Sequence, residues 1–301
     1  MTGTGEPRMP RVLVVTMAAG EPQLNRGRES VASQSCVLAT QVVLEGLGMG
    51  EAFVAARDLI VESGPDYDWF LLLNADMVLV APGSLSALIR CADRRGAAQR
   101  LTTPVLDSFT RSQINGIHLI RGRSALNISD AEDEIFHDSW VAALTGITID
   151  GARNPQALHA PDPDVPQSLR FGLQRGMKAL AGGPRSGRWD TIDLVVANWR
   201  HRRTPALDAA LLGILTGLGR GPVEPYPALV NEFDAGGARL LAMAEEGAAG
   251  PFVSVSVLSR PGGTWRLHHS LFGSSAATAR SFAAMRKRQA WHAAGRWRET
   301  V

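Results

Sequence analysis

Residues 68–80, DWFLLLNADMVLV, decide the fold of this chain. Trp69 to Leu73 is an apolar run of strand length without polar alternation, which predicts a strand buried on both faces within a parallel sheet. The run ends on Asn74 and Asp76, which lie on the same side of an extended segment. Open α/β sheets bind ligands at the carboxyl ends of their strands, so these oxygens predict a site for Mg²⁺ or Mn²⁺ bridging a diphosphate. A strand that simply ends in a polar turn is the alternative interpretation.

Composition indicates a soluble globular protein. The chain has 301 residues, 45% hydrophobic and 20% charged, enough for one large domain or two ordinary ones. Residues 1–165 carry 13 Lys/Arg and 20 Asp/Glu, whereas residues 166–301 carry 18 and 9. The halves therefore attract each other, or the second faces an anionic partner. Neither half interleaves aromatic residues with its charges, which argues against a nucleic-acid partner.

Cysteine usage and the ends of the chain favour the cytoplasm. Cys36 and Cys91 are too few for a disulfide framework and lack metal-site spacing, so both are expected to be small buried hydrophobes. Residues 1–10 contain no signal-peptide core, and the apolar stretch 207–218 is too short to span a membrane.

The first half alternates strands and helices. This alternation predicts a mostly parallel α/β sheet flanked by helices. Apolar runs predict further strands at 11–16, 40–45, 100–106, 116–120 and 146–149, and helical patterns are expected at 30–37, 51–63 and 82–94. Pro161, Pro163 and Pro166 mark a boundary, which divides the chain into domains 1–165 and 166–301.

The second half is expected to be a mainly helical, basic extension carrying a β-hairpin. Helical patterns occur at 167–180, 190–199, 207–218, 235–246 and 276–298, and the hairpin is expected at 252–271. The extension could form the acceptor platform, cap the active site, contact an anionic membrane surface or make a homo-oligomer. The helix at 167–180 is most simply one that packs on the core.

Together these pieces resemble the family 2 glycosyltransferases of the GT-A fold, over roughly residues 10–180. The residues that carry the resemblance follow the family's order along the chain: Glu21 after the first strand, Ser30 and Gln34, Glu45 after the second strand, Ala55–Asp58, Asp68–Leu79, Gly116–Arg121, Glu132-Asp133 and His159. The resemblance implies a Rossmann-like GT-A domain. It also implies a hexosyltransferase that takes its sugar from a nucleoside diphosphate sugar and gives it to a glycan, lipid or small-molecule acceptor.

The resemblance also implies roles for individual residues. Asp76 and His159 are expected to bind Mn²⁺ or Mg²⁺, which would neutralise the leaving diphosphate. Asp133, in the position of the second acid of the Glu-Asp motif, is expected to be the general base, with Glu132 beside it at the catalytic site. Transfer would be inverting, in one displacement. Contacts to the donor are expected from Thr16, Glu21, Glu45, Arg57, Asn74 and Asp76, and Gly116 and Arg121 are candidates for the acceptor side.

Two departures from the family pattern keep other functions open. The metal motif is Asn74-Ala75-Asp76 rather than Asp-x-Asp, so it carries less negative charge, and residues 127–131 replace the usual Gly-Gly-Phe. A non-catalytic scaffold that binds nucleotide sugars is one alternative. A nucleotidyltransferase is the other, although the first strand is followed by no glycine-rich, lysine-bearing signature.

Overall fold

The computed structural model describes residues 8–96, 98–127, 144, 146–148, 155–183 and 188–219. Within these ranges the chain forms two compact units. The first holds residues up to Ser108 and from Gln113 to Asp162, and the second holds Phe109–Ser112 and the residues from Pro163 onward. The predicted hairpin at 252–271, the predicted helices at 235–246 and 276–298, and Glu132-Asp133 lie outside the described residues.

One sheet forms the first unit. Among the described residues it contains β1 (Arg11–Ala18), β2 (Leu38–Glu45), β3 (Trp69–Asn74), β4 (Met77–Leu79), β5 (Arg100–Asp107), β6 (Ser112–Arg121), β7 (Gly146–Thr148) and β8 (Ala157–His159). Their order is β2-β1-β3-β6-β5-β8-β4, with β7 paired to β5. β1 runs parallel to β2 and β3, and β5 runs parallel to β7 and β8. β3 with β6 and β4 with β8 are antiparallel. The predicted α/β class with a mostly parallel sheet is confirmed.

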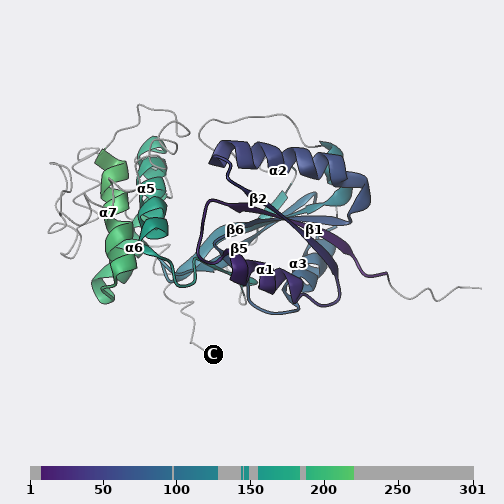
Figure 1. Ribbon diagram of the computed structural model, residues 1–301, viewed down its shortest axis with the longest axis horizontal. Coiled ribbons are helices and arrows are strands. Elements are labelled where there is room, and N and C mark those ends of the chain that lie inside the picture. The colour runs from purple at the N-terminus through teal and green to yellow at the C-terminus, as the bar shows by residue number, and fades with distance from the viewer. Residues whose placement is uncertain are drawn as a thin grey trace, which may run out of the picture. The chain divides into compact units, whose positions relative to one another are not determined.

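Helices cover both faces of this sheet (Figure 1). They are α1 (Leu24–Ala32), α2 (Met49–Ser63) and α3 (Ser84–Asp93), with the short 3-10 helices η1 (Gly64–Asp66) and η2 (Gly122–Asn127). Leu71 and Leu73 of β3 share a core cluster with residues of α1 and α3, such as Val31 and Leu85. Phe70 and Leu72 share another with Ala56 and Ile60 of α2. Burial on both faces explains why the apolar run of β3 shows no polar alternation.

The first helix was predicted in the wrong place. The sequence pattern suggested 30–37, but α1 spans Leu24–Ala32. Gly27 lies against the backbone of β4, and a Cβ there would meet the carbonyl oxygen of Met77 at 3.0 Å. A close backbone approach through glycine leaves no apolar stripe in the sequence, so periodicity could not locate this helix. Cys36, in the turn after α1, is exposed rather than buried, and Cys91 is half-buried.

Three helices form the described part of the second unit: α5 (Val165–Ala181), α6 (Arg188–His201) and α7 (Pro205–Gly219). Asp164 caps α5 by accepting a hydrogen bond from the Gln167 backbone N–H at 2.8 Å. Phe109 lies in the same unit and stacks on Phe171 of α5, with ring centroids 4.0 Å apart. Among the described residues no helix combines the length and apolarity needed to cross a bilayer.

Glycines allow α5 and α7 to touch backbone to backbone. Each helix carries two glycines four residues apart. A Cβ added at any of them would lie 1.9–2.4 Å from a carbonyl oxygen of the other helix; the glycines are Gly172, Gly176, Gly213 and Gly217, and the oxygens belong to Ala210, Ile214, Leu169 and Leu173. Real Cβ atoms cannot approach so closely, so this packing of α5 on α7 requires glycine at all four positions.

Candidate functional site

Three neighbouring strands deliver polar side chains to one edge of the sheet. Asp107 is the last residue of β5 and His159 the last residue of β8, and these parallel strands place the two residues in register. Asp76 comes directly before β4, which runs antiparallel to β8 with Met77 opposite His159. The end of one strand and the start of its antiparallel neighbour lie at the same edge, so all three side chains meet there.

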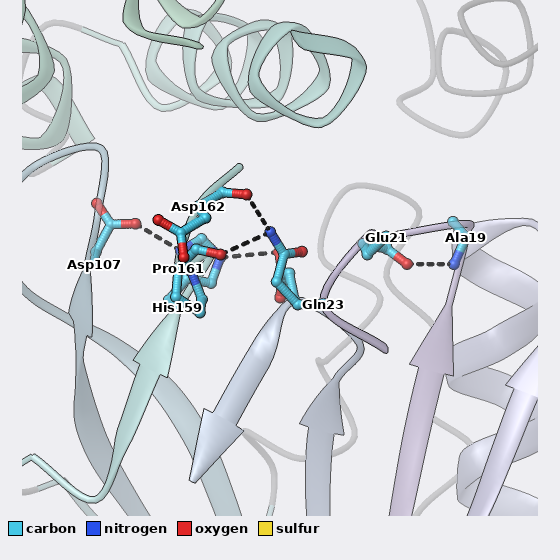
Figure 2. A network of polar contacts seen from close by, with 8 residues as sticks. Ala19, Glu21, Gln23, Asp107, His159, Pro161 and Asp162 are labelled. Atoms are coloured by element: carbon cyan, nitrogen blue, oxygen red, sulfur yellow. Dashed lines mark hydrogen bonds and ion pairs between the residues drawn. The ribbon is translucent and has the colours of Figure 1, made fainter. Parts of the chain in front are cut away.

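His159 lies between the two carboxylates. Its Nδ1 is 2.6 Å from Oδ1 of Asp107, and its Nε2 is 3.2 Å from Oδ2 of Asp76. Figure 2 shows the first of these contacts beside the residues that hold the following loop. Asp107 and His159 are buried, whereas the Asp76 side chain keeps 19% of its surface exposed. Asp76 is therefore the member of the trio that solvent or a ligand reaches most readily.

The two carboxylates set the charge of His159. Burial alone would lower the pKa of the imidazole, but the negative charge of Asp76, hydrogen bonds to Asp107 and Asp76, and the charge of Asp107 outweigh burial. Together they raise the pKa of His159 to about 10. In the metal-free chain this favours an imidazolium, which donates to both carboxylates.

The loop after His159 is held in an unusual backbone conformation. Ala160 and Asp162 have φ values of 48° and 57°, a backbone region that residues other than glycine seldom adopt. The Ala160 N–H donates to the carbonyl oxygen of Asp76 at 2.7 Å. Gln23, the N-cap residue of α1, donates from Nε2 to the carbonyl oxygens of Pro161 at 3.0 Å and Asp162 at 3.2 Å (Figure 2). These bonds fix the loop that carries His159.

Helix α1 and the turn after it also hold the segment that follows Asp76. Ser30 Oγ accepts a hydrogen bond from the Leu79 N–H at 3.1 Å. Gln34 accepts from the Leu85 N–H at 2.9 Å and donates to the Ala81 carbonyl oxygen at 2.8 Å. Ser30 and Gln34 belong to the family-like motif, and here they anchor the connection between β4 and α3.

The predicted donor contacts on β1, β2 and β3 share the carboxyl edge of those parallel strands. Thr16 is buried and accepts from Gln41 Nε2 at 2.8 Å. Glu21 follows β1 and accepts from the Ala19 N–H at 2.7 Å, as Figure 2 shows. Glu45 ends β2 and pairs with Arg28 at 2.8 Å. Asn74 ends β3, exposed and opposite Met17.

Other predicted residues lie elsewhere. Arg57 is near the middle of α2 and pairs with the adjacent Asp58 at 2.9 Å. Arg121 lies over the ring of Trp69, the first residue of β3, and pairs with Asp93. It is therefore at the sheet edge opposite Asn74. Gly116 is half-buried, and a Cβ there would meet the side chains of Val105 and Met77. An acceptor-side role for Arg121 and Gly116 stays a prediction.

Sequence reasoning missed Asp107 and Gln23. The strands expected at 100–106 and 116–120 leave residues 107–115 between them, but β5 extends to Asp107 and β6 begins at Ser112. The available signal was the one used for Asn74 and Asp76, an acid directly after a buried apolar strand. No sequence signal pointed to Gln23, because its hydrogen bonds go to backbone groups 138 and 139 residues away.

Asp76 and His159 are the predicted cation ligands, and the distance between them can be compared with that between two ligands of a metal ion. Among the described residues no group of three or more His, Cys, Asp or Glu side chains is arranged to hold a metal ion. Adjacent ligands of an octahedral Mg²⁺ lie about 3 Å apart, given bonds of about 2.1 Å. The separation of 3.2 Å between Nε2 and Oδ2 is close to this distance between ligands. Nε2 can bind a metal ion only after it has lost its proton. Mg²⁺ commonly takes only one or two protein ligands and completes its shell with water and substrate phosphates.

Comparison with known proteins assigns no family. No protein-family model matches the chain, and no curated protein matches it in sequence. A solved structure of the mannosyltransferase PcManGT from Pyrobaculum calidifontis, in complex with GDP-Man and Mn²⁺, is similar over 92% of this chain and 88% of its own, with 13% identity and a TM-score of 0.41.

Two other solved structures match about half of the chain. The CMP:2-keto-3-deoxy-manno-octonic acid synthetase complexed with CTP is similar over 48% of this chain and 92% of its own, with 10% identity and a TM-score of 0.29. A197 from STIV is similar over 46% of this chain and 82% of its own, with 13% identity and a TM-score of 0.35. At such scores these likenesses give this chain no activity.

Proposed function

We propose that this chain is a metal-assisted glycosyltransferase that moves a hexose from a nucleoside diphosphate sugar to an acceptor hydroxyl. The observation that carries the proposal is the placement of Asp76 beside His159, at the sheet edge where Asn74 and Glu45 also end their strands. That edge is where α/β sheets bind nucleotides. The order of family-like motifs along the sequence supports the same activity.

Each of the following predicted site residues has a proposed role in binding the donor or in catalysis. Asp76 and His159 would hold Mn²⁺ or Mg²⁺, which would supply Lewis-acid stabilisation of the leaving diphosphate. Glu21, Glu45, Thr16 and Asn74 are assigned to the nucleoside side. Asp133, with Glu132 beside it, is assigned as the base that removes the proton of the acceptor hydroxyl.

The reaction is a single displacement with inversion. The acceptor oxygen forms a bond to the anomeric carbon while the bond from that carbon to the phosphate oxygen breaks. The proton of the hydroxyl goes to the base, and the electron pair of the broken bond leaves with the nucleoside diphosphate. Glycans, lipids and small molecules remain the acceptor classes, and the residues from Pro163 onward are a candidate acceptor platform, cap or oligomer surface.

Release of nucleoside diphosphate tests the proposal. The full chain is incubated with a panel of nucleoside diphosphate sugars, with and without Mn²⁺, and the nucleotide product is measured. We expect metal-dependent turnover with one donor and its loss in Asp76→Ala. Asp93→Ala is the matched control, because this carboxylate pairs with Arg121 at the opposite edge. Equal turnover by wild type and Asp76→Ala would contradict the proposal.

Two other outcomes would identify the alternative functions, a nucleotidyltransferase or a scaffold. Pyrophosphate released from a nucleoside triphosphate and a sugar phosphate would assign the chain as a nucleotidyltransferase. Binding of a nucleotide sugar that raises the melting temperature without turnover, across a broad range of acceptors, would assign a scaffold.

A further inference from the structure

Asp107 is a buried carboxylate to which the proposed reaction gives no role. The residue has none of its surface exposed, and its Oδ1 lies 2.6 Å from Nδ1 of His159. Burying a charged carboxylate is costly unless a partner compensates it. The short contact to the imidazole supplies such compensation.

The contact determines how the imidazole ring is turned. A ring whose Nδ1–H donates to a fixed carboxylate has its Nε2 on the opposite side, and here Nε2 lies 3.2 Å from Asp76. Metal-binding histidines generally donate their second ring N–H to a carboxylate, carbonyl or water in this way, which fixes the ring and the nitrogen that remains for the metal. Asp107 occupies that position relative to His159.

We propose that Asp107 is a positioning residue of the donor site: its carboxylate holds the His159 ring so that Nε2 and the Asp76 carboxylate together receive a divalent cation. This inference rests on the proposed function. The strand order provides the rigidity, because β5, β8 and β4 are neighbours and bring Asp107, His159 and Asp76 to one edge. A displacement of β5 relative to β8 would turn the ring.

A purely structural role for the ion pair between Asp107 and His159 predicts a different result. If Asp107 only stabilised the fold, its removal would lower the free energy of unfolding without altering a cation bound by the remaining folded protein. Val105→Ala is a matched control, since Val105 is a fully buried residue of the same strand. This variant should lose stability through a small cavity while it leaves the edge of the sheet unchanged.

Electron paramagnetic resonance of Mn²⁺ alone, bound to the full chain, tests the role of Asp107. We expect wild type to show hyperfine coupling to a coordinated imidazole nitrogen and His159→Ala to lack it. In Asp107→Ala we expect Mn²⁺ to bind about 10–100-fold more weakly, with loss of the nitrogen coupling. Asp107→Asn keeps the shape and an acceptor oxygen, so its loss should be smaller, and Val105→Ala should bind Mn²⁺ as wild type does.

Two results separate failure of this inference from failure of the proposed function. Folded Asp107→Ala or Asp107→Asn that binds Mn²⁺ with wild-type affinity and wild-type nitrogen coupling overturns the role of Asp107, while donor turnover by wild type leaves the function standing. Wild type that neither shows nitrogen coupling nor turns over any donor overturns both. If Asp107→Ala does not fold, the comparison of Asp107→Asn with Val105→Ala decides.

Discussion

The side-chain amide of Gln23 donates a hydrogen bond to the carbonyl oxygen of Pro161, with 3.0 Å between nitrogen and oxygen. The same nitrogen reaches the carbonyl oxygen of Asp162 at 3.2 Å. Helix α1 thereby holds a loop that contains two residues with positive φ, directly after His159. The conformation of this loop depends on a buried donor that lies far away in sequence.

We expect Gln23→Leu to destabilise the chain by about 1–3 kcal/mol, because it leaves two carbonyl oxygens without this donor in a buried place. The measurement is the free energy of unfolding in urea. Arg26→Ala is the control, since it removes only an exposed ion pair to Asp162 and should cost at most about 1 kcal/mol. A cost for Gln23→Leu no greater than that of the control would show that the loop does not need the amide.

Cys36 offers a test of backbone strain away from the site. It is exposed and has a φ of 62°. This conformation costs a residue with a Cβ about 1–2 kcal/mol, and glycine adopts it without that cost. Glycine, however, loses more backbone entropy on folding. We expect Cys36→Gly to stabilise the chain by about 1 kcal/mol in urea unfolding and Cys36→Ala to leave stability nearly unchanged. Equal stabilities of the two variants would mean that φ at this position is relaxed in solution.

Most of the sheet could be predicted from the sequence because its longer strands contain apolar runs, whereas the three-residue strands β4 and β8 were not predicted. The run at β3 and the run at β1 are buried on both faces, so their composition alone marks them. Helix α1 could not be placed, since its close contact with β4 goes through Gly27 rather than through an apolar stripe. Propensity and periodicity contain no information about backbone-to-backbone contacts.

The candidate site was predictable only in part. Resemblance to a family predicted Asp76 and His159 as two ligands of one cation, and in the structure Nε2 of His159 lies 3.2 Å from Oδ2 of Asp76. Asp107 is 52 residues from its partner His159, and their contact follows from β5 and β8 being neighbours in the sheet. Strand order is set by tertiary packing, so local sequence patterns could not reveal the contact.

The raised pKa of His159 gives the stability of the metal-free chain a defined pH dependence. The pKa is about 10 in the folded state and near 6.5 in an unfolded chain. The stabilisation is therefore complete below about pH 6.5 and is lost as the pH rises toward 10, because the folded state binds the extra proton throughout that range. With a chelator present, the stability difference between wild type and His159→Gln should shrink from pH 7 to pH 10. A difference that stays constant would mean that the ring is already neutral at pH 7.

Packing of α5 on α7 predicts an unusual response to a single methyl group. Alanine normally favours a helix over glycine by about 1 kcal/mol. In Gly172→Ala, however, the new Cβ would meet the carbonyl oxygen of Ala210 at 1.9 Å, so the helices must separate. We expect a net loss of about 1–3 kcal/mol in urea unfolding. Thr216→Ala on α7 is the control and should change stability little. Among the contacts described, the Thr216 hydroxyl donates only to the carbonyl oxygen of Leu212, within its own helix. Stabilisation by Gly172→Ala would contradict the close contact.

Asn74 provides a direct test of where the cation binds. It stands two residues before Asp76, at the exposed end of β3, and Asn74→Asp adds a second carboxylate at that edge. Since affinity for hard divalent cations rises with the number of charged oxygen ligands, we expect Mn²⁺ to bind about 3–10-fold more tightly in this variant. The double variant Asn74→Asp/Asp76→Asn has the net charge of wild type but moves the carboxylate away from His159. It should therefore bind Mn²⁺ more weakly than wild type by calorimetry or by titration of free Mn²⁺. Equal binding by the double variant and wild type would mean that only the charge of this edge matters, and that Asp76 and His159 do not form a shared site.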